Sequence, residues 1–251
     1  MGSEMCIRDR FSPRHGADVA ASELYDFMSA SGLQPHELEQ RMLDSESAEL
    51  GDLHGIDGIF VGGSPHTVTN PHKDEEQEHV ERLLRALTGT RIPVINICFG
   101  AHVLADTHGG TIVRLHPEDS GPTQVRLTDA AASDPLCRSL PSTFQAFTGH
   151  TENIEILPQD ATLLAYGDAC PIQIFRIGET QWATQFHAEM DASGLRQRME
   201  FYRNYGYFGV DEFTTIVNAT AKVDVSPARQ ILANFVDFCR SYSRELSQSV
   251  A

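Results

Sequence analysis

The chain has 251 residues, of which 41% are hydrophobic and 22% are charged. This is enough apolar sequence for a full core, so a small module that depends on disulfides is excluded. Nineteen Lys and Arg residues against thirty-five Asp and Glu residues give a formal net charge of −16. Because such a charge repels phosphate groups, we expect neither nucleic acid nor a membrane surface as a partner.

The five cysteines include no Cys-x-x-Cys pair, so neither a disulfide framework nor a zinc knuckle is indicated. No apolar run is long enough to span a bilayer, and the start of the chain lacks the pattern of a signal peptide. We therefore expect a cytoplasmic protein that needs no metal ion and no cofactor.

The first half of the chain alternates helix and strand. Apolar residues at helical spacing predict a helix over 17–31, closed by Gly32. A nearly all-apolar run at 58–61 is typical of a buried parallel strand, and an amphipathic helix follows around 80–87. A second buried strand is predicted over 92–97, with a helix directly after it. This order predicts a doubly wound parallel sheet.

The second half changes character. Short apolar runs separated by turn residues predict a small mixed or antiparallel strand region, with runs at 111–115, 124–127, 144–147, 161–166, 172–177 and 182–186. Two helices are predicted to close the chain, and Cys239 belongs to the apolar stripe of the last one.

No internal repeat or long linker divides the sequence, so we expect a single domain over 1–251, with 206–251 as a C-terminal helical extension. Residues 1–16 form a poorly defined N-terminus. Its only apolar run is Met5-Cys6-Ile7, which indicates that the opening strand of the sheet is truncated or incorrectly encoded.

Cys98 lies where the second buried strand meets the following helix. The amide dipoles of a helix N-terminus favour the thiolate, which is the nucleophilic form of cysteine. Gly100 and Ala101 are small, so the backbone can turn sharply there and a substrate can approach. The sequence therefore predicts Cys98 as a nucleophile.

A partner base is predicted at the end of the last apolar run. His187 ends this run, and Glu189 can point to the same side, so that His187 exchanges a proton while Glu189 fixes its tautomer. Upstream, Gly62 and Gly63 end a strand and can offer N–H groups to a developing oxyanion. All these residues fall at predicted carboxyl ends of strands, where open α/β sheets place their sites.

Segments 93–102 and 185–189 resemble the two signatures of the class-I (triad) glutamine amidotransferases. That family has Gly-x-Cys-x-Gly-His-Gln around its nucleophile and Phe-His-Pro-Glu near the domain end, with a Gly-Gly-Pro loop upstream. The resemblance covers about 58–205 and extends to the glutaminase domains of enzymes such as GMP synthase. It implies a flavodoxin-like α/β fold, in which a doubly wound, mostly parallel sheet is flanked by helices.

The resemblance also implies a role for each residue of the site. Cys98 would be the nucleophile, His187 the acid and base, and Glu189 the orienting carboxylate. The amides of Gly63 and Phe99 would form the oxyanion hole. The residues that would bind the substrate are Gly62, His102, Gly149 and His150.

This sequence departs from the family motifs at several positions. Asn96 replaces Gly, Ala101-His102 replaces His-Gln, Ala188 replaces Pro, and Ser64 is inserted in the Gly-Gly-Pro loop. None of these changes removes a catalytic group. The missing Gln at position 102 normally shapes the glutamine pocket, so the departures bear on substrate identity more than on chemistry.

The resemblance implies that Cys98 attacks the γ-carboxamide of glutamine and forms a γ-glutamyl thioester, whose hydrolysis gives glutamate after ammonia has left. Residues 206–251 are too few to form a synthetase, so the ammonia would pass to a separate synthetase subunit. Two alternatives stay open. One is a stand-alone γ-glutamyl hydrolase or peptidase, and the other is a non-catalytic binding domain on the same fold.

Overall fold

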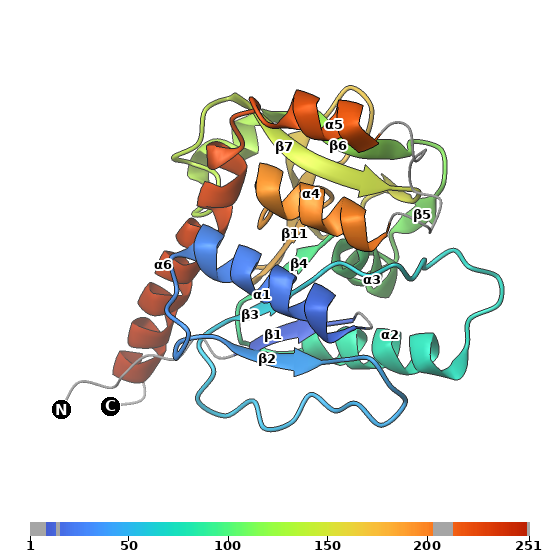
Figure 1. Ribbon diagram of the computed structural model, residues 1–251. Helices are drawn as coiled ribbons and strands as arrows, with labels where there is room; N and C mark the ends of the chain where they lie inside the picture. The colour runs from blue at the N-terminus through green and yellow to red at the C-terminus, as the bar shows by residue number, and fades with distance from the viewer. Residues whose placement is uncertain (1–8, 14–15, 203–212, 250–251) are drawn as a thin grey trace.

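The computed structural model describes residues 9–13, 16–202 and 213–249, which are drawn in colour in Figure 1. The run Met5-Cys6-Ile7 lies outside these residues. The strands are β1 (Asp9–Ser12), β2 (Glu39–Met42), β3 (Ile59–Val61), β4 (Val94–Ile97), β5 (Thr111–Val113), β6 (Glu118–Leu127), β7 (Thr143–His150), β8 (Asn153–Ile156), β9 (Ala161–Tyr166), β10 (Ile174–Ile177) and β11 (Gln181–Thr184). The helices are α1 (Ala17–Ser31), α2 (Glu75–Leu87), α3 (Phe99–Thr107), α4 (Ala192–Phe201), α5 (Phe213–Thr220) and α6 (Ser226–Ser249), with a short 3-10 helix at Asp129–Ser133.

One large sheet has the strand order β2-β1-β3-β4-β11-β10-β9-β6-β7, and β5 pairs with β8 in a separate ribbon. The strands from β2 to β11 along this order pair in parallel. From β11 onward each pair is antiparallel. The predicted parallel sheet with a partly antiparallel region is thus confirmed.

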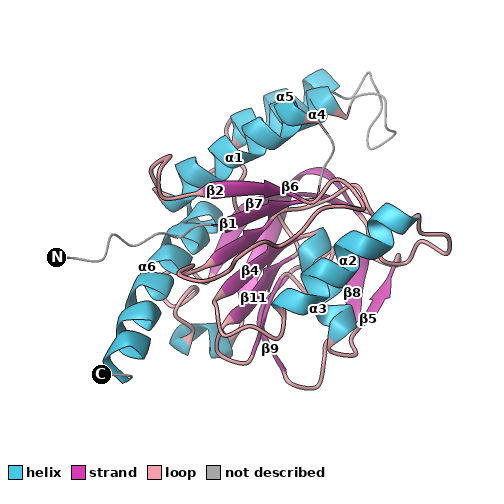
Figure 2. Cartoon of the chain, turned by 90° about the horizontal axis from the view of Figure 1, so that it is seen from below, coloured by secondary structure: helices cyan, strands magenta, loops and turns pink. Residues whose placement is uncertain are grey.

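Helices cover both faces of the sheet, with α1 and α6 on one face and α2 and α3 on the other (Figure 2). The strand alternation explains this division. In β3, Ile59 and Val61 belong to the core beneath α2 and α3. Phe60, between them, points the other way and contacts the rings of Phe27 on α1 and Phe235 on α6, with centroid distances of 5.2 and 5.3 Å.

The C-terminal helix is part of the core layer that covers the sheet. Its apolar stripe contacts α1 and the sheet, and Cys239 is fully buried beside Gly58. Two closing helices were expected, but three follow β11 in the described residues. Only the last of the two expected helices was located in the sequence, by its apolar stripe, and it corresponds to α6.

At the start of the chain the structure has a four-residue strand, β1, where the sequence indicated a truncated one. It lies between β2 and β3, and its Phe11 is fully buried. The neighbouring β2 is the edge strand, and its Glu-Gln-Arg-Met sequence shows no apolar alternation. An edge strand exposed in this way needs little apolar sequence, which is why no pattern predicted it.

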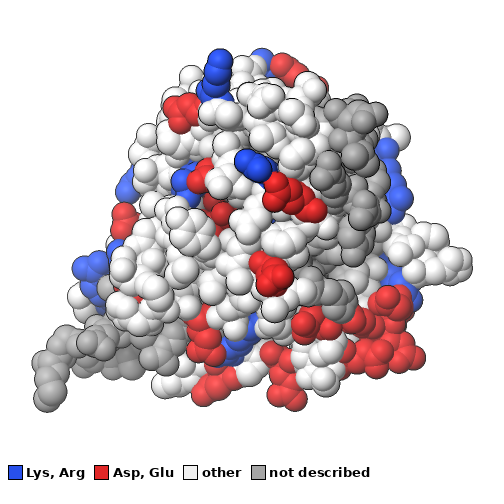
Figure 3. Space-filling model, viewed as in Figure 1, with Lys and Arg blue, Asp and Glu red and all other residues white. Residues whose placement is uncertain are grey.

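Acidic side chains gather at the lower right of the face in Figure 3, over the end of α2. The first turn of this helix carries Glu75, Glu76 and Glu78, and Asp74 caps it by accepting a hydrogen bond from the N–H of Gln77 at 2.8 Å. Negative groups at a helix N-terminus are stabilised by the helix dipole, so this acidic run has a structural explanation.

Candidate active site

Cys98 occupies a sharp turn between β4 and α3. Its φ of 51° makes it the only non-glycine residue with a positive φ in the part of the chain that the structure describes. The turn is held by two hydrogen bonds: the N–H of Cys98 donates to Thr184 O at 2.8 Å, and the N–H of His102 donates to Cys98 O at 3.2 Å. The thiol therefore lies at the carboxyl end of the parallel strands, in a strained backbone conformation of the kind found at functional sites.

Gly100 permits this turn. A Cβ atom at this position would lie 2.8 Å from Cγ1 of Val61 and 3.3 Å from Cβ of Asn96. Both distances are shorter than ordinary contacts between carbon atoms, so α3 could not pack this closely on β3 and β4 with a larger residue. The small residue that the sequence has beside Cys98 is thus required by packing.

His187 follows β11, and both its backbone and its ring are held by hydrogen bonds. Its N–H donates to Phe147 O at 2.9 Å, and its Nδ1 lies 2.7 Å from Oε1 of Glu189. Glu189 is completely buried. A carboxylate bonded to Nδ1 leaves Nε2 as the ring nitrogen that can exchange a proton with a substrate.

Glu189 is kept ionised by its neighbours. Burial acts to raise the pKa of Glu189, but the charge and hydrogen bond of His187 and the charge of Arg198 outweigh it, so the pKa lies well below its ordinary value. Arg198 comes from α4, and its Nη2 is 3.7 Å from Oε1 of Glu189. A buried cation thus lies against Glu189 and stabilises the ionised carboxylate that holds His187.

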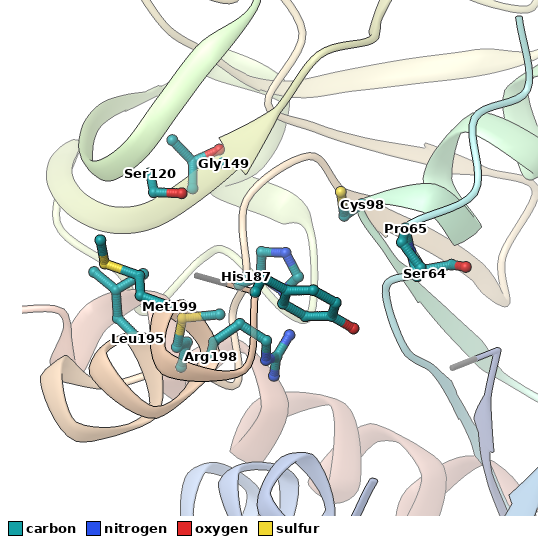
Figure 4. Close-up of a pocket in the computed structure, with 12 residues that line it drawn as sticks. Ser64, Pro65, Cys98, Ser120, Gly149, His187, Leu195, Arg198 and Met199 are labelled. Atoms are coloured by element: carbon teal, nitrogen blue, oxygen red, sulfur yellow. The ribbon is translucent and has the colours of Figure 1, made fainter. Parts of the chain in front are cut away.

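Two hollows meet at Cys98. The first, which we call the polar hollow, is lined by polar side chains that include Thr67, His102 and Glu152. The second, which we call the apolar hollow, extends from Cys98 past His187 (Figure 4). Met190, Leu195, Met199 and Tyr202 supply most of its apolar lining, and Ser120 and Thr148 line it as well.

The polar hollow contains a buried hydrogen-bond network. His102 Nε2 lies 2.8 Å from Oε1 of Gln185, and His102 Nδ1 lies 3.4 Å from Oε2 of Glu152. Glu152 also accepts hydrogen bonds from the N–H groups of Val68 at 2.9 Å and Thr69 at 2.6 Å. Burial acts to raise the pKa of Glu152, but the hydrogen bond and charge of His102 and the hydrogen bond from Thr69 lower it overall, so Glu152 offers a fixed negative charge.

Behind the polar hollow, His150 Nε2 lies 2.9 Å from Oε2 of Glu118. Glu118 also accepts hydrogen bonds from Thr123 and Gln173, and together these partners lower its pKa against the effect of burial. With Cys170, His150 and Glu118 could present three ligand atoms within 4.8 Å of one another to a metal ion. Burial raises the pKa of the Cys170 thiol to about 12, so this thiol is protonated when no metal ion is bound.

The structure brings most of the predicted site residues together. Those that line one or both hollows are Cys98, Phe99, His102, Gly149, His150 and His187. Gly62 is placed differently, because its N–H donates to Phe11 O at 3.0 Å within the sheet. Ser64 and Pro65, which directly follow Gly63, line both hollows.

Several residues of the site were missed by sequence reasoning. Arg198 and Glu118 give no local signal, because neither belongs to a motif or to the end of an apolar run. In the apolar lining of the second hollow, Leu195 and Met199 show the i, i+4 spacing of any buried helix face, and Met190 precedes that helix.

A family model described as glutamine amidotransferase class-I matches residues 25–204. The chain therefore belongs to the class-I glutamine amidotransferase family, and the resemblance noted in its sequence is confirmed.

Individual proteins show the same relationship. A glutamine-hydrolysing GMP synthase subunit from Thermoplasma acidophilum is 28% identical over 163 residues, which cover 64% of this chain and 75% of that protein. The glutamine-hydrolysing GMP synthase of Porphyromonas gingivalis is 32% identical over 140 residues, 55% of this chain and 26% of that longer protein. A solved glutamine amidotransferase from Thermotoga maritima matches with a TM-score of 0.75 at 17% identity, over 94% of this chain and 99% of that one, and this likeness concerns the fold.

In the part of the chain that the structure describes, no helix combines the length and apolar character needed to cross a membrane.

Proposed function

We propose that the protein hydrolyses the γ-carboxamide of glutamine with Cys98 as the nucleophile, His187 as the acid and base, and Glu189 as the orienting carboxylate. The observation that carries this proposal is the geometry around the apolar hollow. Cys98 and His187 both line it, and the 2.7 Å contact with Glu189 leaves Nε2 of His187 for proton exchange.

In the first half of the reaction the Cys98 thiol gives its proton to His187, and the resulting thiolate attacks the γ-carbonyl carbon. The N–H of Phe99 is available for the oxyanion because Phe99 is the first residue of α3, where N–H groups have no partner within the helix. The N–H of Gly63 would be the second donor. His187 then protonates the departing nitrogen, the C–N bond breaks, and ammonia leaves a γ-glutamyl thioester on Cys98.

In the second half, His187 takes a proton from water, which attacks the thioester. The C–S bond breaks, glutamate is released, and His187 returns the proton to the sulfur of Cys98. Glu189 stays ionised throughout, because His187 and Arg198 hold its pKa low, and it stabilises the imidazolium that forms in each half.

The polar hollow would hold the amino-acid end of glutamine. Its negative Glu152 would attract the α-ammonium group, and His102, which stands where the family has Gln, would help to shape the pocket. Gly149 and His150 line the same hollow and would close it beside Cys98.

We propose further that the ammonia serves a separate synthetase subunit. The family assignment and the likeness to the glutamine-hydrolysing GMP synthase subunit from Thermoplasma acidophilum support this partner. When this protein is added to a matching synthetase, the synthetase should become able to use glutamine as the nitrogen source for its amination reaction.

The test of the proposed chemistry is the release of glutamate and ammonia from glutamine by the purified protein. Equal amounts of the two products are expected. Glu189→Gln should lower kcat by about 10² to 10⁴-fold, because it disturbs the tautomer of His187 but leaves the nucleophile in place. Glu200→Gln, the same change at an exposed position of α4, should leave kcat as it is. Absence of both products from the wild-type protein would favour the non-catalytic binding domain.

A further inference from the structure

The two hollows at Cys98 must receive different parts of a γ-glutamyl substrate. The nitrogen that leaves has to be protonated by His187, so it must lie on the side of Cys98 where His187 is. His187 lines the apolar hollow. The amino-acid end would then occupy the polar hollow, which contains the charged and hydrogen-bonding groups suited to it. Any group attached to the leaving nitrogen would therefore enter the apolar hollow.

The lining of the apolar hollow suits a group larger than ammonia. Met190, Leu195 and Met199 are each at most 4% exposed, and Tyr202 completes this side. Ammonia is small and polar, so it gains nothing from two thioethers and an isobutyl group. An alkyl substituent of a few carbons would bury apolar surface against them.

The shape of the hollow favours a small substituent over a protein partner. The exposed part of Met190, Leu195 and Met199 lies inside the hollow, where a small group can reach it and a flat protein surface cannot. What remains is a concavity that leads from the nucleophile past the general acid. Concave apolar sites next to a few polar groups are typical of small-molecule binding.

The charges around the apolar hollow favour a neutral substituent. Among the described residues that line it, the cation is Arg198, and its guanidinium is shared by three carboxylates. Glu23 lies 3.2 Å from Arg198, and Asp26 and Glu189 each lie 3.7 Å from it. An additional carboxylate on the substrate would meet a cation that is already neutralised, and it would be repelled by the acidic groups behind it.

We propose that the same site also hydrolyses γ-glutamyl amides whose nitrogen carries a neutral alkyl group, and that this group binds in the apolar hollow. The inference rests on the proposed function, since it uses the same nucleophile. Cys98 forms a bond to the γ-carbon, the C–N bond breaks, and His187 supplies the proton with which a primary amine leaves. Water then cleaves the thioester, so that one amide and one water give glutamate and one amine.

The test compares substrates of equal intrinsic reactivity. In N5-methyl-, N5-propyl- and N5-isopentylglutamine the amide is secondary throughout, and only the length of the alkyl group changes. Burial of a methylene corresponds to roughly a fourfold gain in kcat/KM. We therefore expect kcat/KM to rise by at least about tenfold from the methyl to the isopentyl compound. A flat or falling series would overturn the inference.

A second comparison tests the preference for a neutral group. γ-Glutamyl-leucine equals the isopentyl amide with one added carboxylate. We expect its kcat/KM to be at least about tenfold lower than that of the isopentyl amide. Equal kcat/KM values for the two substrates would contradict the proposed preference for a neutral substituent.

Substitutions in the hollow test where the alkyl group binds. Met199→Gln keeps the length of the side chain and makes it polar, so the isopentyl-to-methyl ratio of kcat/KM should fall by at least about threefold. Leu195→Asn is the alternative should Met199→Gln fail to fold by circular dichroism. Met28→Gln on α1, away from both hollows, is the matched control and should keep the wild-type ratio. A folded Met199 or Leu195 variant with an unchanged ratio would overturn the inference.

The two proposals fail in different ways. If glutamine is hydrolysed with dependence on Cys98 but the alkyl series is flat, the apolar hollow does not bind the leaving group and the proposed function stands. If neither glutamine nor any amide gives glutamate that depends on Cys98, the proposed function itself fails.

Discussion

Arg198 lies against the same carboxylate oxygen that holds the histidine of the site. Its Nη2 is 3.7 Å from Oε1 of Glu189, and this oxygen also accepts the hydrogen bond from Nδ1 of His187. On its other side Arg198 faces Glu23 and Asp26 of α1. One cation on α4 thus connects three buried carboxylates and couples the packing of α1 to the ionisation of Glu189.

Replacing Arg198 with Met should weaken both stability and catalysis. Removal of one partner from a buried ion pair costs about 3 to 5 kcal/mol, so the free energy of unfolding should fall by about 3 kcal/mol at pH 8. Without the cation, the pKa of Glu189 rises, and the acid limb of the kcat/KM profile should move to higher pH. Arg198→Lys should recover part of the lost free energy of unfolding, and its acid limb should lie closer to that of the wild type.

The control for this prediction is Arg196→Met, which removes an exposed arginine from the same helix. It should leave the unfolding free energy and the pH profile near those of the wild type. Chemical denaturation at pH 8 and initial rates from pH 5 to 9 provide the two measurements. An unmoved acid limb in a folded Arg198→Met protein would show that the arginine does not act on Glu189.

Asp26 should make the stability of the protein depend on pH. Burial raises the pKa of Asp26 from 3.8 to about 7 against the attraction of Arg198, and Glu189 and Asp191 add repulsion. The folded state thus binds a proton that the unfolded state has lost between pH 3.8 and about 7, and the free energy of unfolding should fall as the pH rises through this range.

Asp26→Asn removes this titration. One pKa unit corresponds to about 1.4 kcal/mol, so the variant should be more stable than the wild type at pH 8 by at least about 1 kcal/mol. At pH 4 the difference should vanish, because the wild-type carboxyl is then protonated. Asp18→Asn, at an exposed position of α1, serves as the control. A lower stability of Asp26→Asn at pH 8 would mean that the ionised carboxylate stabilises the fold.

Gly100→Ala should distort the turn that carries the nucleophile. The added Cβ would be 2.8 Å from Val61 Cγ1, and overpacking of this kind costs about 1 to 3 kcal/mol. Since α3 begins beside Cys98, glutaminase activity should fall as well. Gly121→Ala is the matched control, because a Cβ there has no heavy atom within 4 Å. Thermal unfolding of the two variants gives the comparison, and equal midpoints would refute the packing explanation.

The sequence predicted those parts of the fold and site that have a local signal. The helix Ala17–Ser31 and the strand Ala161–Tyr166 were predicted with the bounds that the structure shows, because apolar spacing and glycine mark their ends. Cys98, His187 and Glu189 could be named because strand ends carry the site of an α/β sheet. The strand β2 could not be predicted, since an exposed edge strand needs no apolar residues.

The contacts behind the site could not be predicted either. Arg198 meets Glu23 only because α4 folds back onto α1, and nothing near either residue in the sequence signals this contact. The same holds for the apolar hollow, where the buried face of α4 also forms the wall of a cavity. Long-range packing of this kind appears only once the helices are placed.

The cysteines should differ widely in reactivity. Cys98 lines both hollows, whereas Cys137, Cys170 and Cys239 are fully buried. Burial raises the pKa of each of these three thiols, so they are neutral at pH 8. Brief treatment with iodoacetamide and peptide mapping should show alkylation of Cys98 well before these three, and glutamine should slow it. Equal labelling of all four would contradict the assignment.

The central claim is that glutamine is hydrolysed through a covalent bond to Cys98. Glutamate release by Cys98→Ser, measured beside the wild type and beside Cys137→Ser, tests it most directly, with circular dichroism to confirm folding. We predict that Cys98→Ser releases no glutamate above the blank while Cys137→Ser keeps most of the activity. Turnover by a folded Cys98→Ser protein at more than about a hundredth of the wild-type rate would contradict the account.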